Sequence, residues 1–89
     1  MPQRYFWWDD LNVDQIAEHG VEPFEAEEAV DNRPLTLRAA EGKYIAYGQT
    51  DSGRYLIVVY VLKSEQRVRV ITARDMTQAE KSRFRMRRK

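Results

Sequence analysis

The longest apolar segment of the chain spans residues 55–62, all eight of which are apolar or aromatic. This segment is too short to cross a membrane, and its many β-branched and aromatic residues are typical of a strand buried on both faces. In residues 67–73 (RVRVITA), arginine and valine alternate as in a strand with one face on the core. The polar residues 63–66 separate the two segments. We therefore expect an antiparallel hairpin, with residues 55–62 at the centre of a sheet.

Two shorter segments before this hairpin also have strand patterns. Leu35–Arg38 follows a turn at residues 31–34, and Lys43–Gln49 (KYIAYGQ) alternates in the manner of a half-buried strand. Residues 50–53 (TDSG) have the composition of a hairpin turn into the apolar segment. These patterns predict a meander of three or four antiparallel strands.

Two helices are predicted before the sheet. Asn12 followed by Gln15 resembles an N-cap and its partner, and Gly20 is expected to end this short first helix. Pro23 suits the first turn of a second helix, whose glutamates form an acidic, solvated face. The aromatic residues at positions 5–8 fit either a short edge strand or an arm over the core, with at least one Trp buried.

A third helix is predicted after the sheet. Thr77 and Glu80 have the spacing of a capping box, which marks the start of that helix. Its end is a basic tail at residues 81–89, with six basic residues and no acidic one. The order of elements indicates an α+β fold: two N-terminal helices, a three- to four-stranded antiparallel meander and a C-terminal helix. The length of 89 residues suits one domain, residues 1–89, with a single two-layer core.

Composition excludes several classes of site. The chain has no cysteine, so it has no disulfide framework, thiol nucleophile or cysteine-based zinc site. It has one histidine and no Ser-His-Asp arrangement, glycine-rich phosphate loop or metal-ligand spacing, and we expect neither a metal nor a cofactor. The sequence becomes acidic directly after residues 1–8, before any apolar stretch long enough for a signal peptide or a membrane span. A cytoplasmic setting is therefore the default expectation.

Charge divides the chain into two halves. Residues 1–45 contain four basic and ten acidic residues, a net charge of −6, whereas residues 46–89 contain eleven basic and four acidic residues, a net charge of +7. Either the halves neutralise each other in the fold, or the basic half forms a face that binds a polyanion.

The residues that could carry chemistry are cations and tyrosines on the predicted sheet. They are Lys43, Tyr47, Arg54, Tyr60, Arg67, Arg69 and Arg74. Such a set can cleave RNA, because the 2′-hydroxyl of RNA is itself a nucleophile and the protein need only hold the phosphate, offset charge and assist proton transfer. Binding without catalysis is the alternative that residue chemistry alone favours. For Arg74, a further alternative is an ion pair with Glu80 that braces the corner between strand and helix.

Three stretches of the chain resemble the BrnT family of bacterial type II toxins. They are WDDLNVDQIAEHGVEPFEAEEAV, EGKYIAYGQTDSGRYLIVVYVL and RVRVITARDMTQAEKSRF, with the motifs HGV, GR before an apolar strand, and I(S/T)AR. The resemblance runs from about Trp8 to Phe84. It implies a fold similar to RelE-type ribonucleases and a toxin that arrests translation by cleaving RNA. It also implies a partner, a DNA-binding antitoxin of the BrnA type that masks the toxin.

The resemblance also carries functional residues over to this chain. Arg74 matches the arginine of I(S/T)AR, Arg69 matches the strand arginine, and His19 matches the histidine of HGV. Two positions depart from the pattern: Glu18 replaces a lysine found in many members, and Phe84 replaces a tyrosine in the last helix. If that tyrosine contributes acid or base chemistry, this protein lacks it.

Our hypothesis from the sequence is a ribonuclease toxin that acts without a metal and forms oligomers only through its antitoxin. Arg69 and Arg74 hold the scissile phosphate, and Tyr47, Tyr60 or His19 assists proton transfer. The residues expected to bind RNA are Lys43, Arg54, Arg67, Lys81, Arg83, Arg85, Arg87 and Arg88. The alternative hypothesis is a non-catalytic module that keeps the fold and binds RNA or serves in a protein complex.

Overall fold

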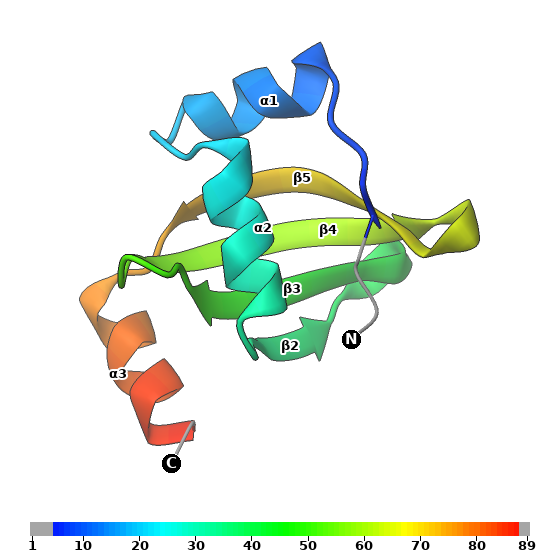
Figure 1. The fold of residues 1–89 in the computed structure, drawn as a ribbon. Helices are drawn as coiled ribbons and strands as arrows, with labels where there is room; N and C mark the ends of the chain where they lie inside the picture. The colour runs from blue at the N-terminus through cyan, green and yellow to red at the C-terminus, as the bar shows by residue number, and fades with distance from the viewer. Residues whose placement is uncertain (1–4, 88–89) are drawn as a thin grey trace.

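In the computed structural model, which describes residues 5–87, five strands form one sheet and three helices flank it (Figure 1). The strands are β1 (Tyr5–Phe6), β2 (Leu35–Arg38), β3 (Lys43–Gln49), β4 (Tyr55–Lys63) and β5 (Arg67–Asp75). The helices are α1 (Asp10–Ala17), α2 (Pro23–Asp31) and α3 (Gln78–Arg87). The α+β class predicted from the sequence is thus confirmed. Among residues 5–87, no helix has the length and apolar character that a membrane span needs.

The sheet has the strand order β1-β5-β4-β3-β2. β4 lies at its centre and is antiparallel to both β3 and β5, as its apolar sequence predicted. The predicted antiparallel meander is present as β2, β3, β4 and β5, but the whole sheet is mixed rather than purely antiparallel, because a fifth strand, β1, precedes the helices and pairs with β5 in parallel. A two-residue strand is too short to show a period in the sequence, so only its aromatic composition indicated a strand.

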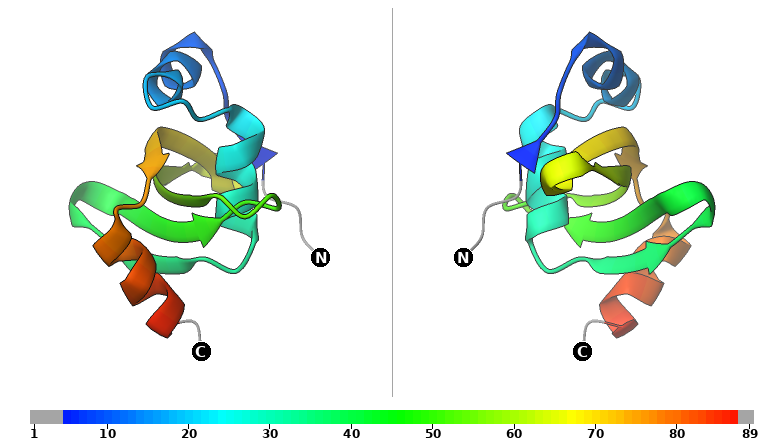
Figure 2. Two further views of the ribbon diagram at one scale, coloured as in Figure 1. Left: turned by 90° about the vertical axis from the view of Figure 1, so that its left-hand side faces the viewer. Right: turned by 90° about the vertical axis from the view of Figure 1, so that its right-hand side faces the viewer.

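The two faces of the sheet carry different helices. α2 covers one face, where Ala26, Ala29 and Val30 pack against apolar residues of β3, β4 and β5, and Ile16 of α1 joins the same core. α3 lies on the other face, where Phe84 packs with Ile57 and a few partly buried residues. Figure 2 shows the sheet between α2 and α3. α3 covers only one end of its face.

A β-bulge in β5 decides which residues share the α3 side of the sheet. Val59 of β4 is opposite Thr72, but the next residue, Tyr60, is opposite Val70, so Ile71 is the extra residue. Alternation alone would have placed Arg74 on the opposite face from Arg67 and Arg69. The extra residue reverses the alternation, and all three arginines lie on the side of the sheet that we call the arginine face.

Helix boundaries agree with the sequence prediction at two starts and differ at one. Pro23 is the first residue of α2, and Thr77 and Glu80 form the predicted capping box of α3 with hydrogen bonds of 2.8 and 3.2 Å. The N-cap of α1 is Asp9 rather than Asn12, which sits three residues later and completes the capping box. α1 ends at Ala17, before the expected Gly20. Asn12 was misread because an Asp or Asn can occupy either role in such a box.

Candidate nucleic-acid interface

The arginine face brings together some of the predicted catalytic residues and separates others. Tyr47 lies on the same side of the sheet as Arg74, since Ile57 is the cross-strand neighbour of both. Tyr60 points to the opposite face, is only 4% exposed, and stacks on Tyr44 in the core at 5.4 Å between ring centroids. His19 is exposed in the turn between α1 and α2. The structure therefore does not place Tyr60 beside Arg74.

Arg74 and Glu80 form a bidentate pair at the corner between β5 and α3. The two terminal nitrogens of Arg74 donate to the two carboxylate oxygens of Glu80 at 3.0 and 3.1 Å, and one also donates to the Asp75 carbonyl at 2.9 Å. The guanidinium of Arg74 and the backbone amide of Thr77 lower the pKa of Glu80 to about 2. The same pair raises the pKa of Arg74. Bracing, which the sequence left open as an alternative, is present in the structure.

A pocket lies next to this corner, between α3 and the arginine face. It has a volume of about 130 Å³ and we call it the α3 pocket. Its lining residues are Leu35, Leu37, Tyr47, Glu80, Arg83, Phe84 and Arg87. Unlike Arg74, neither Arg83 nor Arg87 forms an ion pair with any residue in the described part of the chain. The pocket thus offers two available cations and a tyrosine side chain.

Tyr55 is a residue of this region that sequence reasoning missed. The Nε–H of Arg85 donates to its hydroxyl at 3.3 Å, and Lys81 and Arg85 lie over its ring at 5.7 and 5.3 Å from the centroid. Arg85 is the main cause of the lowered pKa of Tyr55. Two patterns in the sequence could have revealed this role of Tyr55. Strand alternation places Tyr55 on the same face as Ile57, and Lys81 and Arg85 are one helical turn apart, on the same side of α3.

The other end of the arginine face holds a second cluster. Arg69 forms a bidentate pair with Asp9 at 2.9 and 3.3 Å, which ties the N-cap of α1 to β5 and lowers the pKa of Asp9. The guanidinium carbons of Arg67 and Arg69 lie 4.7 and 5.0 Å from the ring centroid of Trp7. Arg69 is therefore a bracing residue like Arg74, at the opposite end of β5.

Two further residues expected to bind RNA also have protein partners. Arg54 donates to Asp75 at 2.8 and 3.1 Å, to Glu25 at 3.0 Å and to the Gly20 carbonyl at 2.9 Å, which ties β4 to β5 and α2. Lys43 lies 3.6 Å from Glu41 at the surface. Arg88 lies outside the described residues.

Comparison with known proteins identifies the family. A family model for BrnT, the ribonuclease toxin of type II toxin-antitoxin systems, matches residues 7–80. The chain belongs to the BrnT family. A type II toxin implies an antitoxin partner for this BrnT chain. A search of curated proteins gave no matching relative.

The BrnT match includes the arginines of β5 and the start of α3. It ends at Glu80, so Arg83, Arg85 and Arg87 lie beyond it. In residues 5–87 of this BrnT chain, no three His, Asp or Glu side chains lie close enough together to hold a metal ion.

Proposed function

We propose that this toxin cleaves single-stranded RNA at the α3 end of the arginine face and thereby inhibits translation in the cytoplasm. The observation that carries the proposal is the α3 pocket, where Arg83 and Arg87 have no ion-pair partner within the described chain and Tyr47 lies beside the Arg74–Glu80 pair. Positive charge fixed around a pocket favours a phosphodiester and the additional charge that its transition state develops.

The reaction is an attack of the ribose 2′-oxygen on the adjacent phosphorus. The bond to the 5′-oxygen of the next nucleotide breaks, which leaves a 2′,3′-cyclic phosphate and a 5′-hydroxyl. Arg83 and Arg87 hold the phosphate, and the cations of the chain, rather than a metal ion, offset its charge. Tyr47 carries the hydroxyl that assists proton transfer, because Phe84, at the tyrosine position of many members, is buried and has no hydroxyl.

Arg74 and Glu80 have separate roles in this proposal. Glu80 is ionised at neutral pH, since its pKa is about 2, and is too weak a base to take the proton from the 2′-hydroxyl. It instead orients the guanidinium of Arg74, whose side chain is 45% exposed beside the pocket that Glu80 lines. We assign Arg69 to RNA binding rather than to catalysis, because Asp9 holds its guanidinium at the end of β5 that is far from the α3 pocket.

A specific observation supports the alternative of a module without cleavage. Both arginines that match the family pattern, Arg69 and Arg74, are held by carboxylates of the chain itself. If Arg69 and Arg74 serve only to form these ion pairs, RNA binding would depend only on the cations of α3 and on Arg67. The partner in either case is an antitoxin, which we propose to be a DNA-binding protein of the BrnA type.

Paired variants of the corner test the proposal. Arg74→Lys keeps the charge but loses the bidentate geometry, and we expect RNA cleavage to fall by roughly 10²-fold or more, the scale of losing one preorganised donor. Glu80→Gln removes the same ion pair but leaves the guanidinium of Arg74, and one amide oxygen to accept from it, so cleavage should fall by less than in Arg74→Lys. Rates are measured on purified protein well below the melting temperature of each variant.

Matched tyrosine variants provide the second arm of this experiment. Tyr47→Phe should lower the cleavage rate, whereas Tyr44→Phe, on the opposite face of the sheet, should not. Equal loss of stability in both corner variants, with full cleavage in Arg74→Lys, would show that Arg74 is only a brace. RNA binding without cleavage by the unmodified protein would favour the alternative function.

A further inference from the structure

Exposed aromatic rings lie at the end of the arginine face that is far from α3. Tyr5 is 68% exposed and Trp7 is 36% exposed. Tyr5 is opposite Arg67 in the parallel β1–β5 pairing, and the ring of Trp7 contacts Arg67 and Arg69. We call these four residues, Tyr5, Trp7, Arg67 and Arg69, the Trp7 platform. A single exposed apolar residue is ordinary, but two exposed rings beside the same arginine form a cluster that calls for an explanation.

The backbone of Trp7 is fixed even though its ring is exposed. Its amide donates to the Val68 carbonyl at 2.8 Å, and its carbonyl accepts from the side-chain amide of Asn12 at 2.9 Å. Asn12 is itself buried and also donates to the Val70 carbonyl at 3.2 Å. A ring on so rigid a support loses little entropy when a ligand stacks on it.

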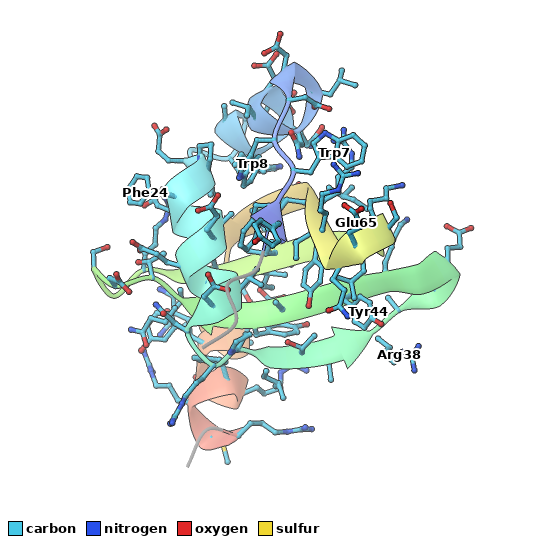
Figure 3. All side chains as sticks on the ribbon, turned by 45° about the vertical axis from the view of Figure 1, so that its right-hand side comes forward. Trp7, Trp8, Phe24, Arg38, Tyr44 and Glu65 are labelled. Atoms are coloured by element: carbon cyan, nitrogen blue, oxygen red, sulfur yellow. The ribbon has the colours of Figure 1, made fainter. Side chains whose placement is uncertain are left out.

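The neighbouring Trp8 shows what a structural tryptophan looks like in this fold. Its indole N–H donates to Glu27 at 2.7 Å, and its ring stacks with Phe6 against the core, at 6.5 Å between centroids. Figure 3 shows Trp8 directed toward α2 and Trp7 directed to the other side of the segment that joins β1 and α1. The indole N–H of Trp7 has no partner within residues 5–87, so burial and hydrogen bonding do not explain this ring.

Charge around the platform favours an anionic ligand. Asp9 neutralises Arg69, but Arg67 forms no ion pair within the described part of the chain. Its Nε is buried and has no hydrogen-bond partner in that part of the chain. Exposed rings beside a cation without a counterion are the combination that single-stranded nucleic acids recognise, with bases stacked on the rings and phosphates near the cations.

We propose that the Trp7 platform stacks a base of the RNA while the α3 pocket holds the scissile phosphate. The inference rests on the proposed function and adds the length of substrate that the protein requires. Arg67 and Arg74 are seven residues apart on β5, or roughly 20 Å at the rise of a strand. A dinucleotide cannot reach both sites, whereas a single strand several nucleotides long can. Because every base has a π face, the platform adds affinity without selecting a sequence.

The test uses the two tryptophans as separate reporters. Trp8→Phe leaves Trp7 as the only tryptophan, and Trp7→Phe leaves Trp8. The ligand is a decanucleotide with 2′-O-methyl groups, which cannot be cleaved because its 2′-oxygens are blocked. We expect the decanucleotide to quench the fluorescence of Trp7 but not of Trp8, and a dinucleotide of the same chemistry to quench neither.

Affinity measurements provide a second readout that does not need Trp8→Phe to fold. Trp7→Ala should weaken binding of the labelled decanucleotide about tenfold, the scale of one lost base–aromatic stack. Phe24→Ala is the matched control, because Phe24 is 58% exposed on α2 and lies well away from Trp7 (Figure 3). Its affinity should match that of the unmodified protein.

The outcomes separate this inference from the proposed function. Unchanged decanucleotide affinity in Trp7→Ala would overturn the platform, even if the protein cleaves RNA. The same holds if Trp7→Ala weakens only the binding of an antitoxin, because the rings would then serve a protein contact. Quenching of Trp7 together with no cleavage of unmodified RNA would support the platform and contradict the proposed function.

Discussion

Glu80 holds two elements together with one carboxylate. It accepts two hydrogen bonds from Arg74 at the end of β5 and one from the backbone amide of Thr77 at the start of α3. A phosphate that approaches Arg74 must therefore share its guanidinium with a carboxylate that stays ionised. In the proposed reaction, such a shared arginine would be fixed in orientation before RNA binds, which suits a residue that stabilises a transition state.

The lowered pKa of Glu80 makes stability depend on pH. A carboxylate with a pKa below its unfolded value of 4.5 stabilises the fold above that value, and the contribution is lost as the pH falls toward 2. Because Arg74 is 45% exposed, solvent screens the pair, and we expect a contribution of no more than about 1 kcal/mol. Urea denaturation of the unmodified protein and Glu80→Gln between pH 6 and about pH 2 measures it.

The difference between these two proteins isolates Glu80 from the other carboxylates. Arginine partners also lower the pKa values of Asp9 and Asp75, so both proteins should lose stability in acid. Only the part of the acid-induced stability loss that is absent in Glu80→Gln is due to the Arg74–Glu80 pair. A constant difference in the free energy of unfolding across this range would mean that Glu80 is not ionised more readily in the folded state.

Single residues were predictable where a local rule applies and not where tertiary packing decides. The capping box of Thr77 and Glu80 follows from spacing alone, and the alternative of an Arg74–Glu80 pair was visible in the sequence. Tyr60 was placed with the catalytic candidates because β4 is apolar on both faces, so its sequence has no alternation to show which way a tyrosine points. Trp7 and Asp9 contact Arg69 only because β1 pairs with β5, a contact between distant parts of the chain.

At the scale of elements, the bulge at Ile71 determines what the arginine face contains. A strand that pairs regularly would present Arg67 and Arg69 on one side and Arg74 on the other. The sequence RVRVITAR contains no glycine or proline that marks an irregularity, so the bulge could not be predicted from it. The single extra residue gives both ends of β5 a cation on the same face.

Gly48 determines how closely α2 approaches β3. A Cβ atom at this position would lie 2.1 Å from the carbonyl oxygen of Ala29, a backbone atom that can move only with the helix. We expect Gly48→Ala to lower the free energy of unfolding by at least about 2 kcal/mol, since overpacking at a rigid contact forces the backbone to shift. Chemical denaturation measures the loss.

Gly42→Asn is the control for this prediction. A Cβ atom at Gly42 meets nothing within 4 Å, and its φ of 74° lies in the left-handed region that Asn tolerates. The free energy of unfolding of this variant should fall by only a few tenths of a kcal/mol. A Gly48→Ala protein as stable as Gly42→Asn would mean that α2 does not rest on β3 at this point.

Across the whole molecule, the two halves of the sequence lie partly on opposite sides of the sheet. The acidic helices α1 and α2 pack on one side and the basic helix α3 on the other. Some charges of the two halves do pair, as in Arg54 with Glu25 and Arg69 with Asp9. The sequence allowed either neutralisation or a basic face, and the fold contains both.

The basic side should make RNA binding depend on salt. Each phosphate contact on a single strand adds about 0.7 to the slope of log affinity against log salt. Replacing Arg83 and Arg87 together by Gln should therefore lower the slope by up to about 1.4 without unfolding the protein. Fluorescence anisotropy over a range of salt concentrations measures the slopes.

Replacing Arg33 and Arg38 by Gln is the matched control, because it removes the same charge from residues that do not line the α3 pocket. Its slope should stay close to that of the unmodified protein. Equal slopes for both double variants would mean that net charge, rather than the α3 pocket, governs RNA binding.

The parallel pairing of β1 with β5 has a consequence for how the protein forms. It joins Tyr5 to Arg67, which are 62 residues apart in a chain of 89, and loop-closure entropy opposes such a contact until the hairpin of β4 and β5 exists. A ribosome makes the N-terminal arm first, but the arm must wait for β5 before it can dock. Arg69, which secures the N-cap of α1, is also made late. The surface around Trp7 is therefore completed only when nearly the whole chain has emerged, so a growing chain cannot yet present it to the RNA that surrounds it.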